Sequence, residues 1–206
     1  MKQYDTYIFD FDGTLFDTRK SLIPVWNAGF SYLGYQIGEE KTALYMKLNM
    51  SQVIELEKIP KDKIEGWGKR VIEALDSKES ISLITPYDET FETIKSLRNR
   101  GARCIIASGN TRKHIMMVLE QHHVESLFDE VVSAEDTASK PKPDVLYKAF
   151  ALVPNLNKDK AVYVGDSLLD TACAGAAGID GILVERNEEY GDYPGIKIDN
   201  LSRLLD

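Results

Sequence analysis

The sequence predicts an α/β fold in which a doubly wound parallel sheet has helices on both faces. Short apolar runs alternate with helical patterns along most of the chain, which is the rhythm of successive β-α-β units. Most of these runs are continuously apolar, as expected of strands that are buried on both faces. A length of 206 residues suits one core domain, with room for an insertion.

Each strand and helix of this core is expected from its own segment. The expected strands are Tyr7–Phe9, Ala102–Ala107, Glu130–Ser133, Ala161–Val164 and Gly181–Val184, with a weaker one at Ile196–Ile198. The expected helices are Asp88–Arg100, Thr111–Gln121, Pro143–Leu152 and Leu168–Ala177. Because parallel strands need crossover connections, helices in these positions favour a parallel sheet.

The stretch from Asp17 to Ile84 interrupts this rhythm, since it contains no convincing strand. Apolar residues recur there at helical spacing, at Leu22, Trp26, Phe30 and Leu33 and again at Ile64, Trp67, Val71 and Leu75. We therefore expect a core domain of residues 1–16 and 85–206 and a helical insertion of residues 17–84. The aromatic stripe that contains Trp26 and Trp67 is expected to pack inside the insertion rather than to contact a ligand.

Composition narrows the functional class. The net charge of −8 argues against binding to nucleic acid or to an anionic membrane surface. No apolar run approaches the ~18 residues of a membrane span, and the first residues lack the apolar region of a signal peptide. Cys104 and Cys173 are the two cysteines and lie in apolar surroundings, which argues against a disulfide framework. These features predict a cytoplasmic protein, and they leave its oligomeric state open.

Two carboxylates, Asp10 and Asp12, follow the first expected strand directly. An extended chain alternates its side chains, so both would leave the strand on the same side. Two carboxylates ~4 Å apart repel by about 4 kcal/mol at an effective dielectric constant of 20. Gly13 permits a tight turn and a close backbone approach to a ligand. Taken alone, the pair could simply be turn and cap residues, because Asp-Gly is a common turn dipeptide.

A second strand end repeats the arrangement. In "AVYVGDSLLD" an apolar strand leads to Gly165 and Asp166, and Asp170 follows four residues later. Taken alone, Asp166 suits a turn and Asp170 suits the first turn of a helix. Two strand ends that each present acids would form a cluster that needs compensation, and a hard divalent cation supplies it. Mg²⁺ is the expected ion.

Four segments, "DFDGTLFDT", "IIASGN", "KPKP" and "YVGDSLLD", follow one another in this order along the chain. Together they resemble the four motifs of the haloacid dehalogenase superfamily, and they frame the whole core. The likeness is greatest to phosphoglycolate-phosphatase-like members that have a helical C1 cap. It implies a Rossmann-like core, a cap that selects the leaving group, and Mg²⁺-dependent hydrolysis of a small phosphorylated metabolite through an aspartyl-phosphate.

The same resemblance implies a role for each matched residue. Asp10 would be the nucleophile and a metal ligand, and Asp12 the general acid/base, with its backbone carbonyl on the metal. The remaining implied roles are a hydroxyl contact to the phosphoryl group from Ser108, backbone N–H contacts from Gly109 and Asn110, and charge compensation by Lys140. Asp166 and Asp170 complete the implied metal site, where Asp166 is a side-chain ligand and Asp170 would orient a metal-bound water or Lys140. Dehalogenases of the superfamily lack an acid at the second position, so Asp12 favours phosphoryl transfer.

Several alternatives stay open. Lys142 competes with Lys140, and Ser108 could be a simple polar loop residue. Arg19, Lys47 and Asn49 could reach a leaving group but are expected at the surface, and Arg186 is interpreted as part of a solvated loop. Phosphoglycolate, sugar phosphates, pyrophosphate and nucleoside monophosphates all remain possible substrates. A phosphomutase resembling β-phosphoglucomutase and a catalytically silent binding module are the alternative functions.

Overall fold

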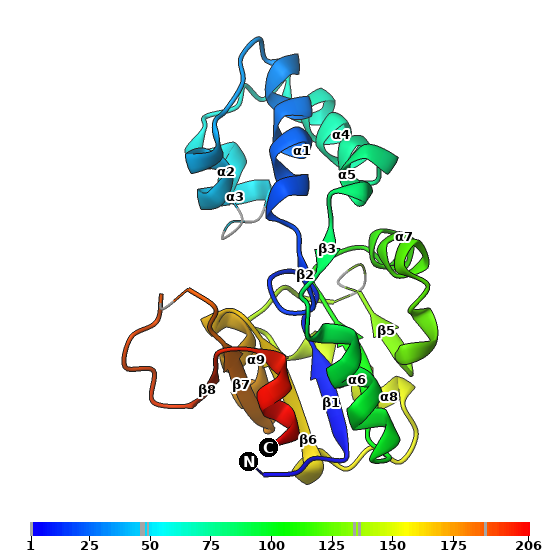
Figure 1. Ribbon diagram of the computed structural model, residues 1–206. Coiled ribbons are helices and arrows are strands. Elements are labelled where there is room, and N and C mark those ends of the chain that lie inside the picture. Colours follow the sequence, from blue (N-terminus) through cyan, green and yellow to red (C-terminus); the bar gives the residue numbers. More distant parts are fainter. Residues whose placement is uncertain (1, 46–47, 49, 134, 136, 188) are drawn as a thin grey trace. The chain divides into compact units, whose positions relative to one another are not determined.

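The computed structural model describes residues 2–45, 48, 50–133, 135, 137–187 and 189–206 (Figure 1). The chain divides into two compact units, which we call the core unit (Met1–Phe16 and Pro86–Asp206) and the helical unit (Asp17–Thr85). The chain leaves the core unit through β2 (Phe16–Asp17) and returns through β3 (Thr85–Pro86). These two strands pair in a small sheet of their own.

The core unit contains a six-stranded sheet in which every pair of neighbours is parallel. Its strands are β1 (Thr6–Phe9), β4 (Arg103–Ala107), β5 (Glu130–Val132), β6 (Ala161–Gly165), β7 (Asp180–Val184) and β8 (Ile196–Ile198), in the order β5-β4-β1-β6-β7-β8. The predicted doubly wound parallel sheet is therefore confirmed. The order reverses direction between β1 and β6, and such a switch point is where open α/β sheets bind ligands at the carboxyl ends of their strands.

Helices cover both faces of this sheet. They are α6 (Thr90–Asn99), α7 (Arg112–His122), α8 (Asp144–Leu152) and α9 (Leu168–Ala177), with 3₁₀ turns η1 (Glu125–Leu127), η3 (Lys158–Lys160) and η4 (Leu201–Leu205). Ile8 of β1 lies in one apolar cluster with residues of α8 and α9. Tyr7 and Phe9 are also buried, and by strand alternation they point to the opposite face. All four residues of β1 are buried because both faces of the sheet are covered.

The helical unit is built from five helices. They are α1 (Arg19–Tyr32), α2 (Glu39–Tyr45), α3 (Met50–Leu56), α4 (Ile64–Leu75) and α5 (Lys78–Ser82). Trp26, Phe30 and Trp67 are buried in one apolar cluster, and the rings of Trp26 and Trp67 stack with centroids 5.9 Å apart. The aromatic stripe is therefore packing, as predicted.

Two short strands of the fold were not predicted. The short strands β2 and β3 have no recognisable pattern in the sequence, because two residues cannot show a periodicity.

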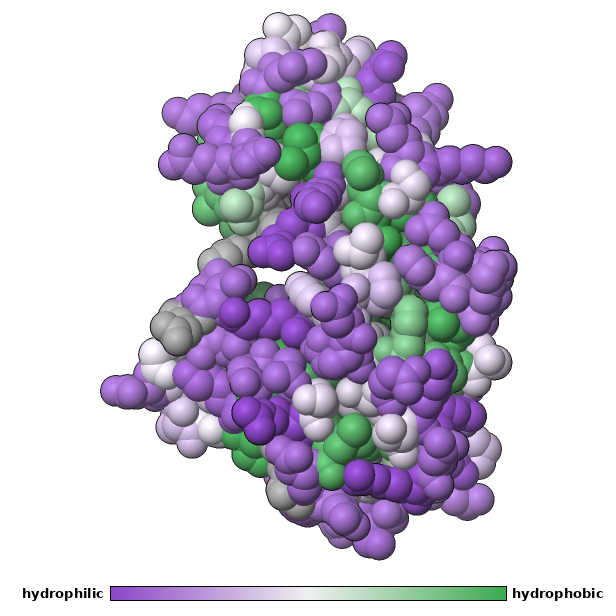
Figure 2. All heavy atoms as spheres, in the orientation of Figure 1, coloured by the Kyte–Doolittle hydropathy of each residue, from purple (hydrophilic) through white to green (hydrophobic). Residues whose placement is uncertain are grey.

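Hydrophilic side chains cover most of the face shown in Figure 2. Among the described residues, no helix is both long enough and apolar enough to cross a membrane. Cys104 and Cys173 are both buried free thiols.

Replacing Trp67 with alanine should destabilise the helical unit by about 3–5 kcal/mol, the usual cost of removing a large buried aromatic side chain. Trp67 is fully buried. Both tryptophans of the chain, Trp26 and Trp67, lie in this unit, so the fluorescence of the remaining Trp26 reports its unfolding in urea. Ile72→Ala on the same helix is the matched control, because Ile72 is 52% exposed, and it should shift the midpoint little. Equal shifts for the two variants would contradict this account of the unit's packing.

Candidate active site

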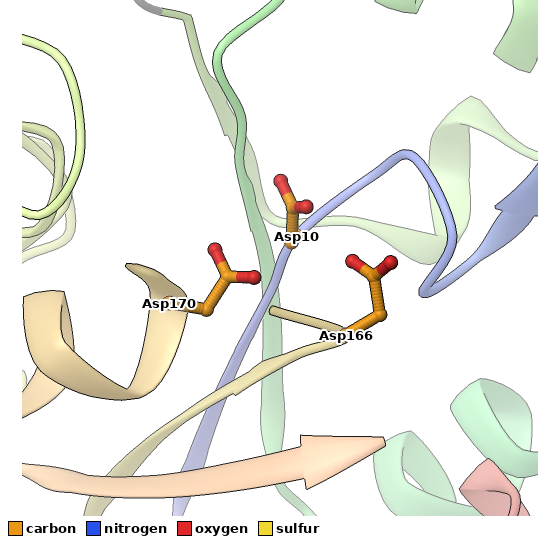
Figure 3. A group of neighbouring side chains, drawn as sticks. All are labelled: Asp10, Asp166 and Asp170. Atoms are coloured by element: carbon orange, nitrogen blue, oxygen red, sulfur yellow. The ribbon is translucent and has the colours of Figure 1, made fainter. Parts of the chain in front are cut away.

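Three carboxylates meet at the carboxyl edge of the sheet (Figure 3). Asp10 directly follows β1, Asp166 directly follows the neighbouring strand β6, and Asp170 lies in the first turn of α9. One carboxylate oxygen from each residue lies within 4.8 Å of the others. Asp10 and Asp170 are buried. The sequence expectation that two strand ends bring their acids together thus agrees with the geometry.

Two glycines make this close approach possible. Gly13 has a φ of +71°, and a Cβ built there would lie 2.1 Å from Asp166 Oδ2. Gly165 is in contact on the other side, since a Cβ there would lie 2.3 Å from Asp170 Cγ. Any larger residue at either position would collide with one of the clustered carboxyl groups. The two glycines therefore allow the backbone to approach the carboxyl groups of Asp166 and Asp170 closely.

Lys140 is the cation that the structure places within this cluster. Its Nζ lies 2.7 Å from Asp10 Oδ1 and 2.5 Å from Asp170 Oδ1, and its side chain is 15% exposed. A cis peptide bond joins Lys140 to Pro141. The competing residue, Lys142, is exposed. The geometry therefore selects Lys140 over Lys142 as the partner of the carboxylates.

Asp170 has a fully occupied carboxylate. Its Oδ1 accepts from Lys140, and its Oδ2 accepts from the backbone N–H of Ser167 at 3.0 Å and from the Ser167 hydroxyl at 2.6 Å. Ser167 in turn caps α9 through the Asp170 N–H, which completes a capping box. Asp170 therefore links the start of α9 to Lys140, and it holds the ammonium group against Asp10.

Burial, together with an excess of carboxylates over cations, raises the pKa values of Asp10 and Asp166. Burial raises the pKa of Asp10 well above its usual value, and Asp170 and Asp166 raise it further, against the opposing effect of Lys140. Burial, followed by the charge of Asp170, raises the pKa of Asp166 to about 7. Burial alone would lower the pKa of Lys140, but the charges of Asp10 and Asp170 outweigh it and raise that pKa well above its ordinary value. The excess negative charge is what a bound cation would offset.

Asp12 lies beside the β4–α7 loop. The amide Nδ2 of Asn110 donates to Asp12 Oδ2 at 2.5 Å. The backbone of Asp12 is fixed by a bridge to Phe16. Asp12 is half-buried, and its charge helps to raise the pKa values of Asp10 and Asp166, so the two acids of the first motif have different hydrogen-bond partners but lie in one electrostatic cluster.

The second motif provides a small polar pocket wall at the end of β4. Ser108 is buried, and its Oγ accepts from the backbone N–H of Asn110 at 3.2 Å. Gly109 is exposed, and a Cβ added there would meet nothing within 4 Å. Ser108 and Gly109 follow β4, the strand beside β1, while the N–H of Asn110 already has an acceptor.

Tyr163 and Arg186 contribute to this region, and the sequence did not single out either of them as a site residue. Tyr163 of β6 donates its hydroxyl to the carbonyl of Ala107 at 2.8 Å, and its ring centroid lies 5.4 Å from the Lys140 ammonium. A tyrosine inside an otherwise apolar strand is the signal that could have marked it, because a buried hydroxyl needs a partner.

The interpretation of Arg186 as part of a solvated loop is wrong. Its side chain is 16% exposed and pairs with Glu89 at 2.8 Å. Its guanidinium lies 3.6 Å from the ring centroid of Tyr87 and donates to the carbonyl of Thr14 at 3.2 Å. The aromatic and acidic partners are far away in sequence, so no local pattern could reveal them. Arg186 fastens the turn that follows β1.

The candidates in the helical unit have a different outcome. Lys47 and Asn49 lie outside the described residues. Arg19 is exposed and forms a two-pronged ion pair with Asp17, at 2.6 and 2.8 Å. Arg19 and Lys20 line a pocket of about 330 Å³. The helical unit therefore has two cationic side chains, Arg19 and Lys20, at this pocket, and Arg19 is already paired with Asp17.

The residues present fit a divalent cation. Asp10 and Asp166 provide oxygen donors from neighbouring strand ends, and the cluster has a surplus of buried negative charge. Oxygen donors and a net negative site are what Mg²⁺ requires. Asp10, Asp166 and Asp170 are the side chains whose oxygens lie close enough together to hold it, and Asp170 also accepts from Lys140 and Ser167.

Comparison with known proteins identifies the class. Residues 7–184 match the family model described as haloacid dehalogenase-like hydrolase, and the chain belongs to this family. The pyrophosphatase PpaX of Halalkalibacterium halodurans is 26% identical over 202 residues, which cover 91% of this chain and 88% of that protein.

Solved structures agree with this assignment. A Bacteroides fragilis protein described as a haloacid dehalogenase-like hydrolase superposes with a TM-score of 0.86 at 25% identity, covering 98% of this chain and 100% of that one. The hydrolase YfnB of Bacillus subtilis, crystallised with magnesium, has a TM-score of 0.77 at 18% identity and covers 99% of this chain and 98% of its own. The fold expected from the resemblance is therefore confirmed.

Mg²⁺ should stabilise the folded protein more at pH 8 than at pH 5.5. The pKa of Asp166 is raised from 3.8 to about 7 in the folded state, so the folded state binds the proton more tightly than the unfolded state. Without metal, this contribution to stability is complete below the unfolded pKa and is lost as the pH rises through about 7. Mg²⁺ competes with that proton for the Asp166 carboxyl group. It can offset the repulsion between the clustered carboxylates only once Asp166 has ionised.

Thermal unfolding after chelation, with and without added Mg²⁺, measures this difference at the two pH values. In Asp166→Asn the metal-free protein should lose less stability between pH 5.5 and 8, and Mg²⁺ should shift its melting temperature less. Asp5→Asn is the control and should behave as the wild type, since Asp5 is exposed and forms a surface ion pair with Lys160. An equal Mg²⁺ shift at both pH values would contradict the assignment of the metal site to these carboxylates.

Proposed function

We propose that this haloacid dehalogenase-like hydrolase is a Mg²⁺-dependent phosphatase that hydrolyses small phosphate esters through an aspartyl-phosphate on Asp10. The observation that carries the proposal is the separation of the two acids of the first motif. Asp10 is buried against Lys140, whereas Asp12 is half-buried against the neutral amide of Asn110. Two carboxyl groups with such different immediate partners suit two different chemical roles.

Asp10 is the group placed for attack. Lys140 and the cluster keep its carboxylate oriented, and a nucleophilic carboxylate divides a difficult displacement into two easier ones. The bond from Asp10 to phosphorus forms as the bond from phosphorus to the leaving oxygen breaks. Bound Mg²⁺ would supply positive charge to the carboxylate and to the phosphoryl oxygens. Lys140 would stabilise the same developing charge from its own side.

Asp12 is the group placed for proton transfer. In the first step its carboxyl group would give a proton to the leaving oxygen. In the second step the resulting carboxylate would take a proton from the water that attacks the phosphorus of the aspartyl-phosphate. Ser108 and the backbone N–H of Gly109 would contact the phosphoryl oxygens, in a loop that leads into the start of α7.

We further propose that residues 17–84 act as a cap that selects the leaving group. The motif residues with proposed chemical roles all lie in the core unit, which leaves selection of the leaving group as the proposed role of the helical unit. The relative PpaX is named a pyrophosphatase. Pyrophosphate is therefore one of the substrates to test, together with phosphoglycolate, sugar phosphates and nucleoside monophosphates. A panel of these compounds with Mg²⁺ tests the proposed activity, and hydrolysis of none of them would overturn it. A requirement for added sugar bisphosphate would instead indicate a phosphomutase.

Asp10→Asn should abolish turnover and leave no phosphoenzyme, because an amide cannot act as the carboxylate nucleophile. Rapid acid quench with a ³²P-labelled substrate measures the phosphoenzyme directly. Asp88→Asn in the same unit is the control and should retain wild-type rates. Retention of more than about a tenth of the wild-type rate in Asp10→Asn would be too small a loss for removal of the nucleophile.

Asp12→Asn should lower turnover by about 10²–10⁴-fold, the usual contribution of a general acid–base group. It leaves Asp10 and the backbone carbonyl of residue 12 in place. An aryl phosphate needs little protonation of its leaving group, so its first step should suffer less than that of an alkyl phosphate. Phosphoenzyme should therefore accumulate with the aryl substrate. Equal losses for both substrates without any accumulation would show that Asp12 is not the acid/base.

Replacing residues from about Thr18 to Ile84 with a short linker should give a folded core that has lost its choice among substrates. The core unit retains its own six-stranded sheet and helices. Circular dichroism would check folding, and the ratio of kcat/KM values across the panel would measure selectivity. An unchanged ratio would show that the helical unit is not the selector.

A further inference from the structure

The side chain of Asn110 is in direct contact with Asp12. Its Nδ2 donates to Asp12 Oδ2 at 2.5 Å, across 98 positions of the sequence. The loops that carry the two residues meet because β1 and β4 are neighbours in register, with Phe9 opposite Ile106. A short contact between an amide N–H and a carboxylate is among the stronger hydrogen bonds in proteins, because the acceptor is charged.

The backbone of each partner is held independently of this contact. Asp12 forms a bridge with Phe16, and the N–H of Gly13 donates to the carbonyl of Phe16 at 2.9 Å. The N–H of Asn110 donates to Ser108 Oγ. The next residue, Thr111, caps α7 by accepting from the N–H of His114. With both backbones fixed, the hydrogen bond restrains the orientation of the Asp12 carboxyl group through its Oδ2.

We infer that Asn110 is the positioning residue for the proposed acid/base Asp12, and that it acts through its side chain. This inference rests on the proposed function. By holding one oxygen of Asp12, the amide restricts rotation of the carboxyl group about its side-chain bonds, so that the group meets the leaving oxygen and later the water in one orientation. Preorganisation of this kind lowers the barrier without any contact between Asn110 and the reacting atoms.

An uncharged donor suits this position. The cation of the site, Lys140, lies against Asp10 and Asp170, where a fixed positive charge helps the nucleophile. A lysine beside Asp12 would stabilise its ionised form and oppose the donation of a proton. An amide orients the carboxyl group and adds no net charge. Asp10 therefore has a charged partner, Lys140, whereas Asp12 accepts a hydrogen bond from a neutral donor, Asn110.

The alternative is that the Asn110 side chain binds the phosphoryl group directly. The two roles differ in how Asn110 and Asp12 combine. A residue that acts only through Asp12 adds nothing once Asp12 has been removed, whereas a residue that binds phosphate itself adds its full effect.

A double-mutant cycle on the breakdown of the phosphoenzyme tests this. Enzyme phosphorylated by an aryl phosphate in the presence of Mg²⁺ is chased with unlabelled substrate, and loss of the ³²P label is followed by rapid quench. Asn110→Ala should slow breakdown by about 10- to 100-fold, the range expected on losing a hydrogen bond to a charged group. Asp12→Ala should slow it more, and the double variant should match Asp12→Ala alone.

Further variants and readouts separate positioning from structural damage. Asn110→Asp has the same shape but places a second carboxylate against Asp12, and it should be at least as slow as Asn110→Ala. Inhibition by inorganic phosphate should be unchanged in Asn110→Ala, because the proposed role is not phosphate binding. Asn99→Ala, an exposed asparagine at the end of α6, should match the wild type in every measurement.

Two outcomes would overturn the inference. If the losses multiply in the double variant, or if Asn110→Ala weakens inhibition by phosphate, Asn110 acts on the phosphoryl group and not through Asp12. If the wild type forms no phosphoenzyme, the proposed function fails and the inference fails with it. Phosphoenzyme in the wild type together with multiplying losses would overturn the inference alone.

Discussion

The pairing of Lys140 with a crowded set of buried carboxylates is the interaction on which the rest of the site depends. Asp10 and Asp170 share the ammonium group at 2.7 and 2.5 Å, and Asp166 adds a third acid to the same cluster. Burial raises the pKa values of Asp10 and Asp166, and because one lysine cannot balance three carboxylates, the neighbouring acids raise them further. Repulsion among these buried carboxylates destabilises the folded protein. The proposed binding of a cation and a phosphoryl group at this site would explain why the cluster is present.

The fold brings this cluster together through short-range features. The strands β1 and β6 are neighbours at the switch point of the sheet, so the residues that follow them emerge side by side. Gly13 and Gly165 remove the two side chains that would keep the acids apart. Asp170 arrives by a different route, as the third residue of a capping box that starts α9. One carboxylate thus caps a helix and also orients the lysine of the site.

Much of this arrangement could be predicted from the sequence, because the signals are local. Each strand of the sheet is a short apolar run, and the strand ends carry Asp10 and Asp166. The contacts that sequence reasoning missed are those between distant segments. Arg186 stacks on Tyr87 and reaches Thr14, and Asn110 reaches Asp12. No spacing rule links such residues, since only the register of neighbouring strands brings their loops together. The strands β2 and β3 were missed for a different reason, because two residues are too few to show a pattern.

The first motif therefore solves a problem that the sequence alone only poses, namely how two acids separated by one residue acquire different properties. Alternation along an extended chain would leave Asp10 and Asp12 on the same side. In the structure the chain turns directly after β1, since Gly13 adopts a φ of +71° and Asp12 bridges to Phe16. The turn sends the Asp12 carboxyl group toward the β4–α7 loop and leaves Asp10 in the cluster. Asp10 then lies against the fixed charge of Lys140, while Asp12 accepts from the neutral amide of Asn110. Separation by one turn is enough to give the two carboxyl groups the different immediate partners that the proposed roles of attack and proton transfer require.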